Sequence, residues 1–320
     1  MQVIDIIDKA LAEKTTRFAF ELLPPLKGDG TRTVFDAIDP LAEFDPAYVN
    51  VTFHREDVKY VERGDGLLEK RVVRRRPGTV GISAAIMKRY GVEAVPHLIC
   101  GGQSRYDIED ALIDMDFLGV HNVLALRGDN MRGERSFAPH PDGHSCAAEL
   151  VKQIADMNNG VFVDGEVEVC HHSQFCIGVA GYPEKHAESP NPDTDLFHLK
   201  AKVDAGAEYI VTQMSFDNRR IFDFIDRCRA AGIEVPVIPG IKPFSTKAQL
   251  SLLPQTFHVD LPQELVAEVE KCRDNKAVRQ VGVEWAVAQA RELKAAGIPV
   301  IHFYTMGKTD NVRNIAKQVF

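Results

Sequence analysis

Residues 17–25 are Arg17-Phe18-Ala19-Phe20-Glu21-Leu22-Leu23-Pro24-Pro25, an apolar run that ends at two prolines. Such a run is typical of a buried β-strand, and proline ends a strand because it has no backbone N–H to donate. Glu21 is the one ionisable residue after Arg17 in this run. A carboxylate buried there must be paired or kept protonated by a raised pKa, and a raised pKa suits a general acid near neutral pH. The alternative is a side chain that points outward to solvent.

Seven further runs of the same kind follow, each bounded by turns or helical stretches. They lie at residues 48–53, 94–100, 122–126, 176–181, 209–214, 236–241 and 300–304. Most are uniformly apolar, as expected of strands that are covered on both faces. Helical periodicity fills the gaps between them. In residues 104–118, for example, Ser104 and Asp107 are expected to form a capping box, and Gly119 ends the helix.

Eight strands that alternate with helices predict an α/β fold, namely a (β/α)8 TIM barrel with inserted loops. A barrel of this kind needs about 250 residues, so we expect residues 1–320 to form a single barrel with insertions. The main alternative is an open doubly wound sheet, which usually carries a glycine-rich turn after its first strand. Here the first strand ends at Pro24-Pro25, and the chain contains no G-x-G-x-x-G motif.

Two stretches, at about residues 55–90 and 158–174, are expected to be the insertions. The first is polar and basic, with Lys70-Arg71 and Arg74-Arg75-Arg76, and this composition favours a solvated surface. The second alternates around Asp164-Gly165, which predicts a β-hairpin before the fifth strand.

Composition excludes several classes of function. A net charge of −8 argues against a general nucleic-acid or membrane-surface role. No apolar run approaches membrane-spanning length, and the six cysteines are scattered without a C-x-x-C pair, which favours a reducing cytoplasm. Cys170-His171-His172 followed by Cys176 could bind a metal, but this spacing matches no standard zinc site, so we expect none.

Polar residues gather where the predicted strands end. In a barrel, the carboxyl ends of the strands form the face that carries the chemistry. The residues at these ends are Glu21, Thr52, His97, Arg127, Asp129, Tyr182, Glu184, His186, Thr212, Gln213, His302 and Tyr304. Each alone has a structural explanation, such as a core histidine or an Arg127–Asp129 pair. Together they suit a large polar heteroaromatic ligand, because they contain no evident nucleophile–base pair and no set with metal-ligand spacing.

The same motifs resemble those of the 5,10-methylenetetrahydrofolate reductase family, in particular bacterial members that consist of the catalytic barrel. The motifs that carry the resemblance are Phe20-Glu21-Leu22-Leu23-Pro24-Pro25, Val51-Thr52, Pro96-His97-Leu98, Leu126-Arg127-Gly128-Asp129, Tyr182-Pro183-Glu184-Lys185-His186, Lys202-Val203-Asp204-Ala205-Gly206-Ala207, Thr212-Gln213, Ile238-Pro239-Gly240-Ile241 and His302-Phe303-Tyr304-Thr305. The resemblance implies a flavoprotein that binds FAD. It would take a hydride from NADH or NADPH and reduce methylenetetrahydrofolate to 5-methyltetrahydrofolate, the methyl donor of methionine biosynthesis, in ping-pong turnover.

The resemblance also implies roles for individual residues. Glu21 corresponds to the general acid that protonates the folate, so that its methylene bridge opens and can accept hydride. Asp129 corresponds to the carboxylate near the flavin and pterin. The flavin-contacting positions are Thr52, His97, Arg127, Gly128, Asp129, Tyr182, His186, Asp195 and Lys202, of which Arg127 and Lys202 would supply cations for the pyrophosphate. The positions that touch the alternating substrates are Glu21, Gln213, Gln249 and Tyr304.

Departures from the family pattern leave the choice between NADH and NADPH open; among them are His198, Ala201 and Leu253. Two other functions remain as alternatives. One is another flavin-dependent barrel, similar to proline dehydrogenase. The other is a non-catalytic barrel subunit, for which the basic insertion and the cysteine–histidine stretch around residue 170 could be docking surfaces. The resemblance further leads us to expect a homo-oligomer.

Overall fold

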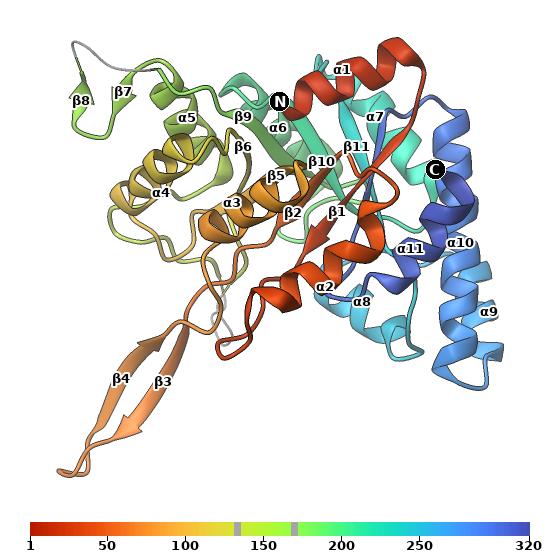
Figure 1. The fold of residues 1–320 in the computed structure, drawn as a ribbon, viewed down its shortest axis with the longest axis horizontal. Coiled ribbons are helices and arrows are strands. Elements are labelled where there is room, and N and C mark those ends of the chain that lie inside the picture. Colours follow the sequence, from red (N-terminus) through yellow and green to blue (C-terminus); the bar gives the residue numbers. More distant parts are fainter. Residues whose placement is uncertain (131–135, 168–171) are drawn as a thin grey trace.

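The computed structural model describes residues 1–130, 136–167 and 172–320. Its centre is a closed barrel of eight parallel strands, with β1 paired to both β2 and β12 (Figure 1). In barrel order the strands are β1 (Arg17–Leu22), β2 (Tyr48–Val51), β5 (Glu93–Ile99), β6 (Asn122–Leu126), β9 (Cys176–Gly181), β10 (Tyr209–Met214), β11 (Val237–Ile241) and β12 (Val300–Phe303). The predicted (β/α)8 barrel is therefore confirmed, and closure between β1 and β12 excludes the open sheet.

Helices surround the barrel and follow its strands. They are α2 (Thr31–Ala42), α3 (Thr79–Tyr90), α4 (Arg105–Phe117), α5 (Ala147–Asn158), α6 (Pro192–Asp204), α7 (Asn218–Ala230), α8 (Gln249–Phe257), α9 (Gln263–Lys271), α10 (Asn275–Ala295) and α11 (Asp310–Val319). The predicted capping box of α4 is present, since the Ser104 side chain accepts from the Asp107 N–H and Asp107 accepts from the Ser104 N–H. Helix α6 begins at Pro192, because Asn191 caps it and proline is favoured in the first turn of a helix.

Strand phase decides which side chains face the barrel interior. Phe18 and Phe20 of β1 pack outward against the surrounding helices, in a core shared with α2 and α11. Ala19 belongs instead to the interior cluster, which α1 (Val3–Glu13) closes at the amino-terminal end of the strands. Because side chains alternate along a strand, Glu21 shares the phase of Ala19 and points into the barrel. The expectation that this carboxyl faces inward is confirmed.

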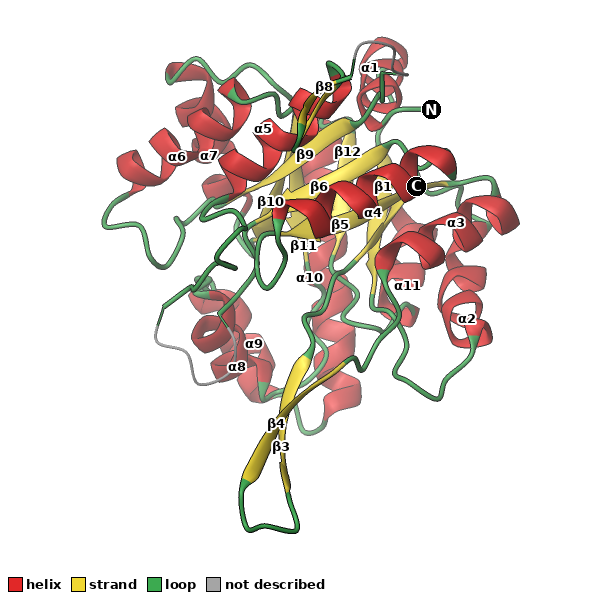
Figure 2. Ribbon diagram, turned by 90° about the vertical axis from the view of Figure 1, so that its left-hand side faces the viewer, coloured by secondary structure: helices red, strands yellow, loops and turns green. Residues whose placement is uncertain are grey.

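The first expected insertion is shorter than residues 55–90. Strands β3 (Asp57–Glu62) and β4 (Leu68–Val73) form an antiparallel hairpin that projects from the carboxyl face of the barrel (Figures 1 and 2). Residues 79–90 are a regular barrel helix, α3, whose Ile82 and Ile86 are buried in the core. In the sequence this helix falls within the expected insertion because the residues before it are polar and basic, and apolar periodicity begins only after Gly78.

The second insertion contains the predicted hairpin, formed by β7 (Val161–Phe162) and β8 (Gly165–Glu166). Phe162 pairs with Gly165, so the two turn residues are Val163 and Asp164, one position earlier than the predicted Asp164-Gly165. Cys170 and His171 lie outside the described residues. Across the parts of the chain that the structure describes, no helix is long and apolar enough to span a membrane.

Candidate active site

A polar layer crosses the barrel below its carboxyl mouth. Asn50 of β2 and His302 of β12 are both buried, and Asn50 Nδ2 lies 3.2 Å from His302 Nδ1. Burial lowers the pKa of His302 to about 3, and burial together with the charge of His54 lowers the pKa of His97 to about 3. Both rings are therefore neutral at pH 7. The Nε2 atom of His97 is buried and has no hydrogen-bond partner among the described residues.

Glu21 lies above this layer, at the end of β1. Burial raises its pKa to about 7, although the Met306 N–H, 3.4 Å from Oε1, and the charge of Lys242 both act to lower it. Lys242 directly follows β11 and is almost completely buried. Burial lowers its pKa to about 8, and the Glu21 charge opposes that change. The mouth thus holds an acid, Glu21, and a base, Lys242, whose pKa values are both shifted toward neutrality. Such shifts are common at catalytic sites.

Tyr304 extends over the strand end between β10 and β12. Its hydroxyl donates to the Thr212 carbonyl oxygen at 2.7 Å, and its ring packs against His302 with centroids 4.9 Å apart. The ring fits because Gly240 has no side chain; a Cβ there would lie 2.5 Å from both the Tyr304 ring and the Thr212 carbonyl oxygen. Gln213 is half-buried beside them, and its Oε1 accepts from the Met214 N–H. Glu21, Gln213 and Tyr304 are thereby placed on inward or rim positions of one mouth.

The loops after β9 supply a second group of predicted residues. The Tyr182 and His186 rings meet edge to face at 4.8 Å. Asp195, in the first turn of α6, accepts from the His186 N–H at 3.2 Å. Lys202, farther along α6, donates to the Ala180 carbonyl oxygen at 2.5 Å, and burial lowers its pKa to about 8. Among the described residues, no carboxylate forms an ion pair with Lys202.

Arg127 follows β6 and forms an ion pair with Glu188, not with Asp129. Its guanidinium makes a two-point ion pair with Glu188, with N–O distances of 2.5 and 2.9 Å. It also lies 4.8 Å from the ring centroid of Phe137. Asp129 is exposed and forms no ion pair with Arg127 within the described part of the chain, so the simple Arg127–Asp129 pair is not what the structure contains.

The β2 side of the mouth contains a histidine that sequence reasoning missed. The Thr52 hydroxyl donates to the Leu22 carbonyl oxygen and lies 3.1 Å from His54 Nε2. Burial and the charge of Arg76 lower the pKa of His54, while Asp129 acts to raise it. His54 is therefore close enough to Arg76, at the base of the β3–β4 hairpin, and to Asp129, in the loop after β6, for both charges to act on it.

Gln249, a predicted substrate-binding residue, forms hydrogen bonds within its own loop. Its Oε1 accepts from the Ser245 N–H at 2.7 Å and from the Thr246 N–H at 3.3 Å. It therefore caps the loop that leads into α8. Lys242 and Glu188 were also missed by sequence reasoning, and only Lys242 left a signal, as a cation directly after a buried strand.

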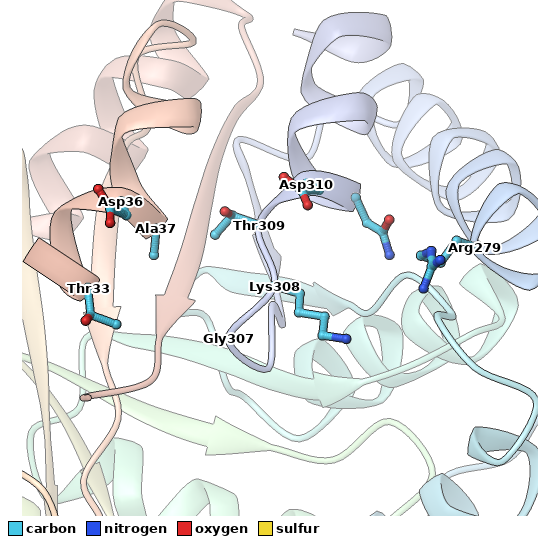
Figure 3. Close-up of a pocket in the computed structure, with 9 residues that line it drawn as sticks. Thr33, Asp36, Ala37, Arg279, Gly307, Lys308, Thr309 and Asp310 are labelled. Carbon is cyan, nitrogen blue, oxygen red and sulfur yellow. The ribbon is translucent and has the colours of Figure 1, made fainter. Parts of the chain in front are cut away.

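A separate pocket of about 550 Å³ lies beside the mouth, between α2, α10 and the start of α11 (Figure 3). Lys308 and Arg279 extend into it, while Asp36 and Asp310 lie on its other sides. Gly307, Lys308 and Thr309, which precede α11, also line this pocket.

These features define a (β/α)8 barrel with a candidate acid–base site at the carboxyl ends of its strands. The chain belongs to the methylenetetrahydrofolate reductase family, whose sequence model matches residues 6–319. It is 30% identical over 310 residues to 5,10-methylenetetrahydrofolate reductase of Escherichia coli, covering 96% of this chain and 92% of that protein.

Eukaryotic relatives match over a smaller share of their length. The chain is 31% identical to methylenetetrahydrofolate reductase (NADH) 1 of Arabidopsis thaliana, covering 96% of this chain and 48% of the relative. It is 28% identical to a probable methylenetetrahydrofolate reductase (NADPH) of Caenorhabditis elegans, covering 98% and 43%. The chain thus spans about half the length of the plant relative and less than half that of the nematode one.

A solved structure supports the fold. It is a protein from Clostridium thermocellum that binds two copies of 5-methyl-5,6,7,8-tetrahydrofolic acid, with 12% identity, 98% coverage of both chains and a TM-score of 0.55. At this identity the likeness concerns the barrel alone.

Proposed function

We propose that this chain reduces 5,10-methylenetetrahydrofolate to 5-methyltetrahydrofolate, with NADH or NADPH as hydride donor and FAD as its flavin, in the cytoplasm. The observation that carries the proposal is Glu21, an inward-facing carboxyl with a pKa of about 7 in the mouth of a barrel of this family. The product would supply methyl groups for methionine biosynthesis. Relatives named for NADH and for NADPH both match the chain, so the two dinucleotides stay as candidates.

The residues at the mouth fit a flavin. His97 Nε2 is a buried polar atom with no hydrogen-bond partner among the described residues, so it could form a hydrogen bond with a bound ligand. Gly128 has a φ of +85°, and a Cβ there would lie 3.2 Å from Ile99 Cβ, so glycine leaves its backbone open to close approach. Bound FAD would supply the hydride transfer between nicotinamide and folate.

The pyrophosphate of FAD would need cations, and the proposal assigns these to Lys202 and Arg127. Burial lowers the pKa of Lys202 and the charge of Asp195 offsets this only in part, so a bound anion would further stabilise the lysine's buried charge. Arg127 is already neutralised by Glu188. Binding would therefore require Glu188 to move away, and its half-exposed side chain is free to do so.

Glu21 would hold the proton that the folate requires. At pH 7 about half of this carboxyl is protonated. A folate nitrogen within hydrogen-bond distance could take that proton, after which the nearby Lys242 charge stabilises the carboxylate that remains. Tyr304 and Gln213 would line the space where folate and nicotinamide bind in turn. The exposed Asp129 would stand on the opposite rim.

The purified protein in anaerobic solution provides the test. The expected result is a flavin absorption spectrum that NADH or NADPH bleaches and that methylenetetrahydrofolate then restores. Bleaching that proline causes and methylenetetrahydrofolate cannot reverse would favour the proline-dehydrogenase-like alternative. A colourless protein that does not take up added FAD would instead favour the non-catalytic subunit.

A further inference from the structure

The β3–β4 hairpin, which we call the arm, stands on a base that borders the barrel mouth (Figures 1 and 2). Arg76, which follows β4, donates from Nη1 to the carbonyl oxygen of Pro24 in the loop after β1. Pro24 is three residues beyond Glu21, so the Arg76 guanidinium lies within about 15 Å of the Glu21 main chain. A ligand held over Glu21 therefore has the base of the arm within reach.

Glycines make room for two arginines at this base. The Arg55 guanidinium lies across the turn after β5, where a Cβ on Gly101 would be 3.3 Å from its Nη1 and a Cβ on Gly102 would be 3.2 Å from its Nη2. A Cβ on Gly78, after β4, would collide with the guanidinium of Arg74. A larger residue at any of these positions would have to displace an arginine. The backbone is thus shaped to accept both guanidinium groups.

The base, which consists of residues 54–57 and 74–76, holds three arginines that have no carboxylate partner in the described part of the chain. They are Arg55, Arg74 and Arg76, which we call the arm-base arginines. Arg74 and Arg76 each donate an N–H to a main-chain carbonyl oxygen. The Nη1 atom of Arg55 is buried and has no hydrogen-bond partner among the described residues. Because each guanidinium has five N–H donors, this group can still donate to a ligand.

Nearby carboxylates do not cancel the charge of the base. Its four arginines outnumber its two carboxylates, Glu56 and Asp57, which leaves a net charge of +2. Asp57 pairs with Arg75, and Glu56 is exposed and forms no ion pair with a described residue. Even with Asp129, whose charge acts on the pKa of His54 from the loop after β6, cations outnumber carboxylates by four to three. An anion bound at the base would therefore be stabilised by its charge.

The ligand that suits this group is a phosphate. A guanidinium presents a planar fork of donors to the oxygens of a phosphate or a carboxylate. A phosphate monoester carries close to two negative charges at pH 7 and has three acceptor oxygens, so it can engage several forks at once. Lys202 and Arg127, the cations assigned to the flavin pyrophosphate, lie on α6 and after β6. The arm base is therefore a separate site that suits a second phosphate-bearing molecule.

We propose that the arm-base arginines bind the 2′-phosphate of NADPH, and that this chain therefore prefers NADPH to NADH. The inference rests on the proposed function, because it requires a dinucleotide whose nicotinamide enters the mouth. NADH lacks the 2′-phosphate and would leave the arginines without their anion. In Rossmann folds, too, an arginine accommodates this phosphate.

Anaerobic reduction of the flavin in the holoenzyme tests the proposal. We expect the second-order rate constant for NADPH to exceed that for NADH about a hundredfold, and Arg55→Ala to lower this ratio by about tenfold or more, the usual effect of losing a hydrogen bond to a charged group. Arg55→Lys should restore only part of the ratio, since lysine keeps the charge but not the fork. Arg71→Ala is the matched control, because Arg71 of β4 pairs with Glu69 on the arm, outside the base. It should leave the ratio unchanged.

A titration that involves no hydride transfer provides a second measurement. Calorimetry of the holoenzyme with adenosine 2′,5′-bisphosphate and with adenosine 5′-monophosphate compares ligands that differ only in the 2′-phosphate. We expect the bisphosphate to bind wild type about a hundredfold more tightly, and the double variant Arg55→Ala with Arg76→Ala to lose most of this difference. Circular dichroism verifies that each variant is folded.

The outcomes separate this proposal from the proposed function. A wild-type flavin that NADH reduces as fast as NADPH, in a protein that binds the two adenosine phosphates equally, would overturn the proposal and leave the proposed function intact. If neither dinucleotide bleaches the flavin, the proposed function is wrong, and the bisphosphate titration still decides whether the arginines bind phosphate. If Arg55→Ala weakens binding of folates with several glutamates but leaves the NADPH-to-NADH ratio unchanged, the arginines bind a carboxylate tail and the proposal is wrong.

Discussion

Replacing Glu21 by glutamine separates proton donation from every other role of this side chain. The amide keeps the size of the carboxyl and can still accept from the Met306 N–H, but it has no proton to give. General acids contribute about 10²–10⁴-fold to rate. We expect reduction of the protein's flavin by NADH or NADPH to change by less than about tenfold and its reoxidation by methylenetetrahydrofolate to fall by the full factor. Anaerobic stopped-flow absorbance follows the two half-reactions separately.

The protonated fraction of Glu21 sets how strongly the rate of the folate half-reaction should depend on pH. With a pKa of about 7, Glu21 is about half protonated at pH 7, whereas an ordinary glutamate with a pKa of 4.5 would be protonated in about one molecule in 300. At pH 9 the protonated fraction of Glu21 falls to about one in 100. The wild-type rate should therefore drop about fifty-fold between pH 7 and pH 9, and the Glu21→Gln rate should stay flat.

Glu184 provides the matched control. It is a partly buried carboxyl in the loop after β9 whose pKa burial also raises, but its Oε1 accepts from the hydroxyl of Ser215, which follows β10. Glu184→Gln should keep the alkaline fall in the folate half-reaction. The reasoning about Glu21 is refuted if its glutamine variant loses both half-reactions equally, or if the wild-type rate does not change between pH 7 and pH 9.

Three further perturbations follow from the same contacts. Lys242→Met removes a charge that lowers the pKa of Glu21, so the alkaline fall in the stopped-flow profile should move to higher pH; an unmoved profile would mean that the two groups do not interact. Glu188→Gln should slow FAD dissociation because it frees Arg127, and Arg127→Ala should accelerate it, as flavin fluorescence during dialysis would show; equal rates in both variants would contradict a role in pyrophosphate binding. The native Glu21 binds a proton that the unfolded chain releases between about pH 4.5 and 7, so wild-type stability is lost as pH rises through that window. Urea unfolding of the apoprotein should show the wild type losing about 2–3 kcal/mol more than Glu21→Gln between pH 5 and pH 8, and parallel losses would contradict the raised pKa.

The barrel could be predicted from the sequence because its strands are covered on both faces, so each appears as an uninterrupted apolar run. The ends of β6, β9 and β10 match the prediction, and the inward direction of Glu21 follows from the alternation of side chains along β1. The start of α3 was hidden, because a polar hairpin separates it from β2. In that case a tertiary feature, the projecting arm, interrupts the local pattern on which the prediction depends.

The site could be predicted only at the level of residue types and strand ends. His97 and Tyr304 occupy inward positions as strand phase requires. The protein partners of Gln249 and Arg127 were not predicted: Gln249 caps a loop, and Arg127 pairs with Glu188. Loop conformation decides such partners, and no periodicity in the sequence encodes it. The same limit explains why Glu188 was missed.

Lys242 shows why the tuning of Glu21 needs a three-dimensional account. The two residues lie far apart in the sequence, on β1 and just after β11. Closure of the barrel brings the Glu21 carboxyl and the Lys242 ammonium near enough for their charges to interact. Burial alone would push the pKa of Glu21 higher, and a carboxyl that holds its proton too tightly is a poor donor at neutral pH. The hydrogen bond from the Met306 N–H and then the positive charge of Lys242 oppose that rise, and the pKa is about 7, where protonated and ionised forms are both populated. In the proposed role, a proton could then leave Glu21 and be replaced within each turnover, and burial, the Met306 N–H and Lys242 would together set the pH range in which the acid works.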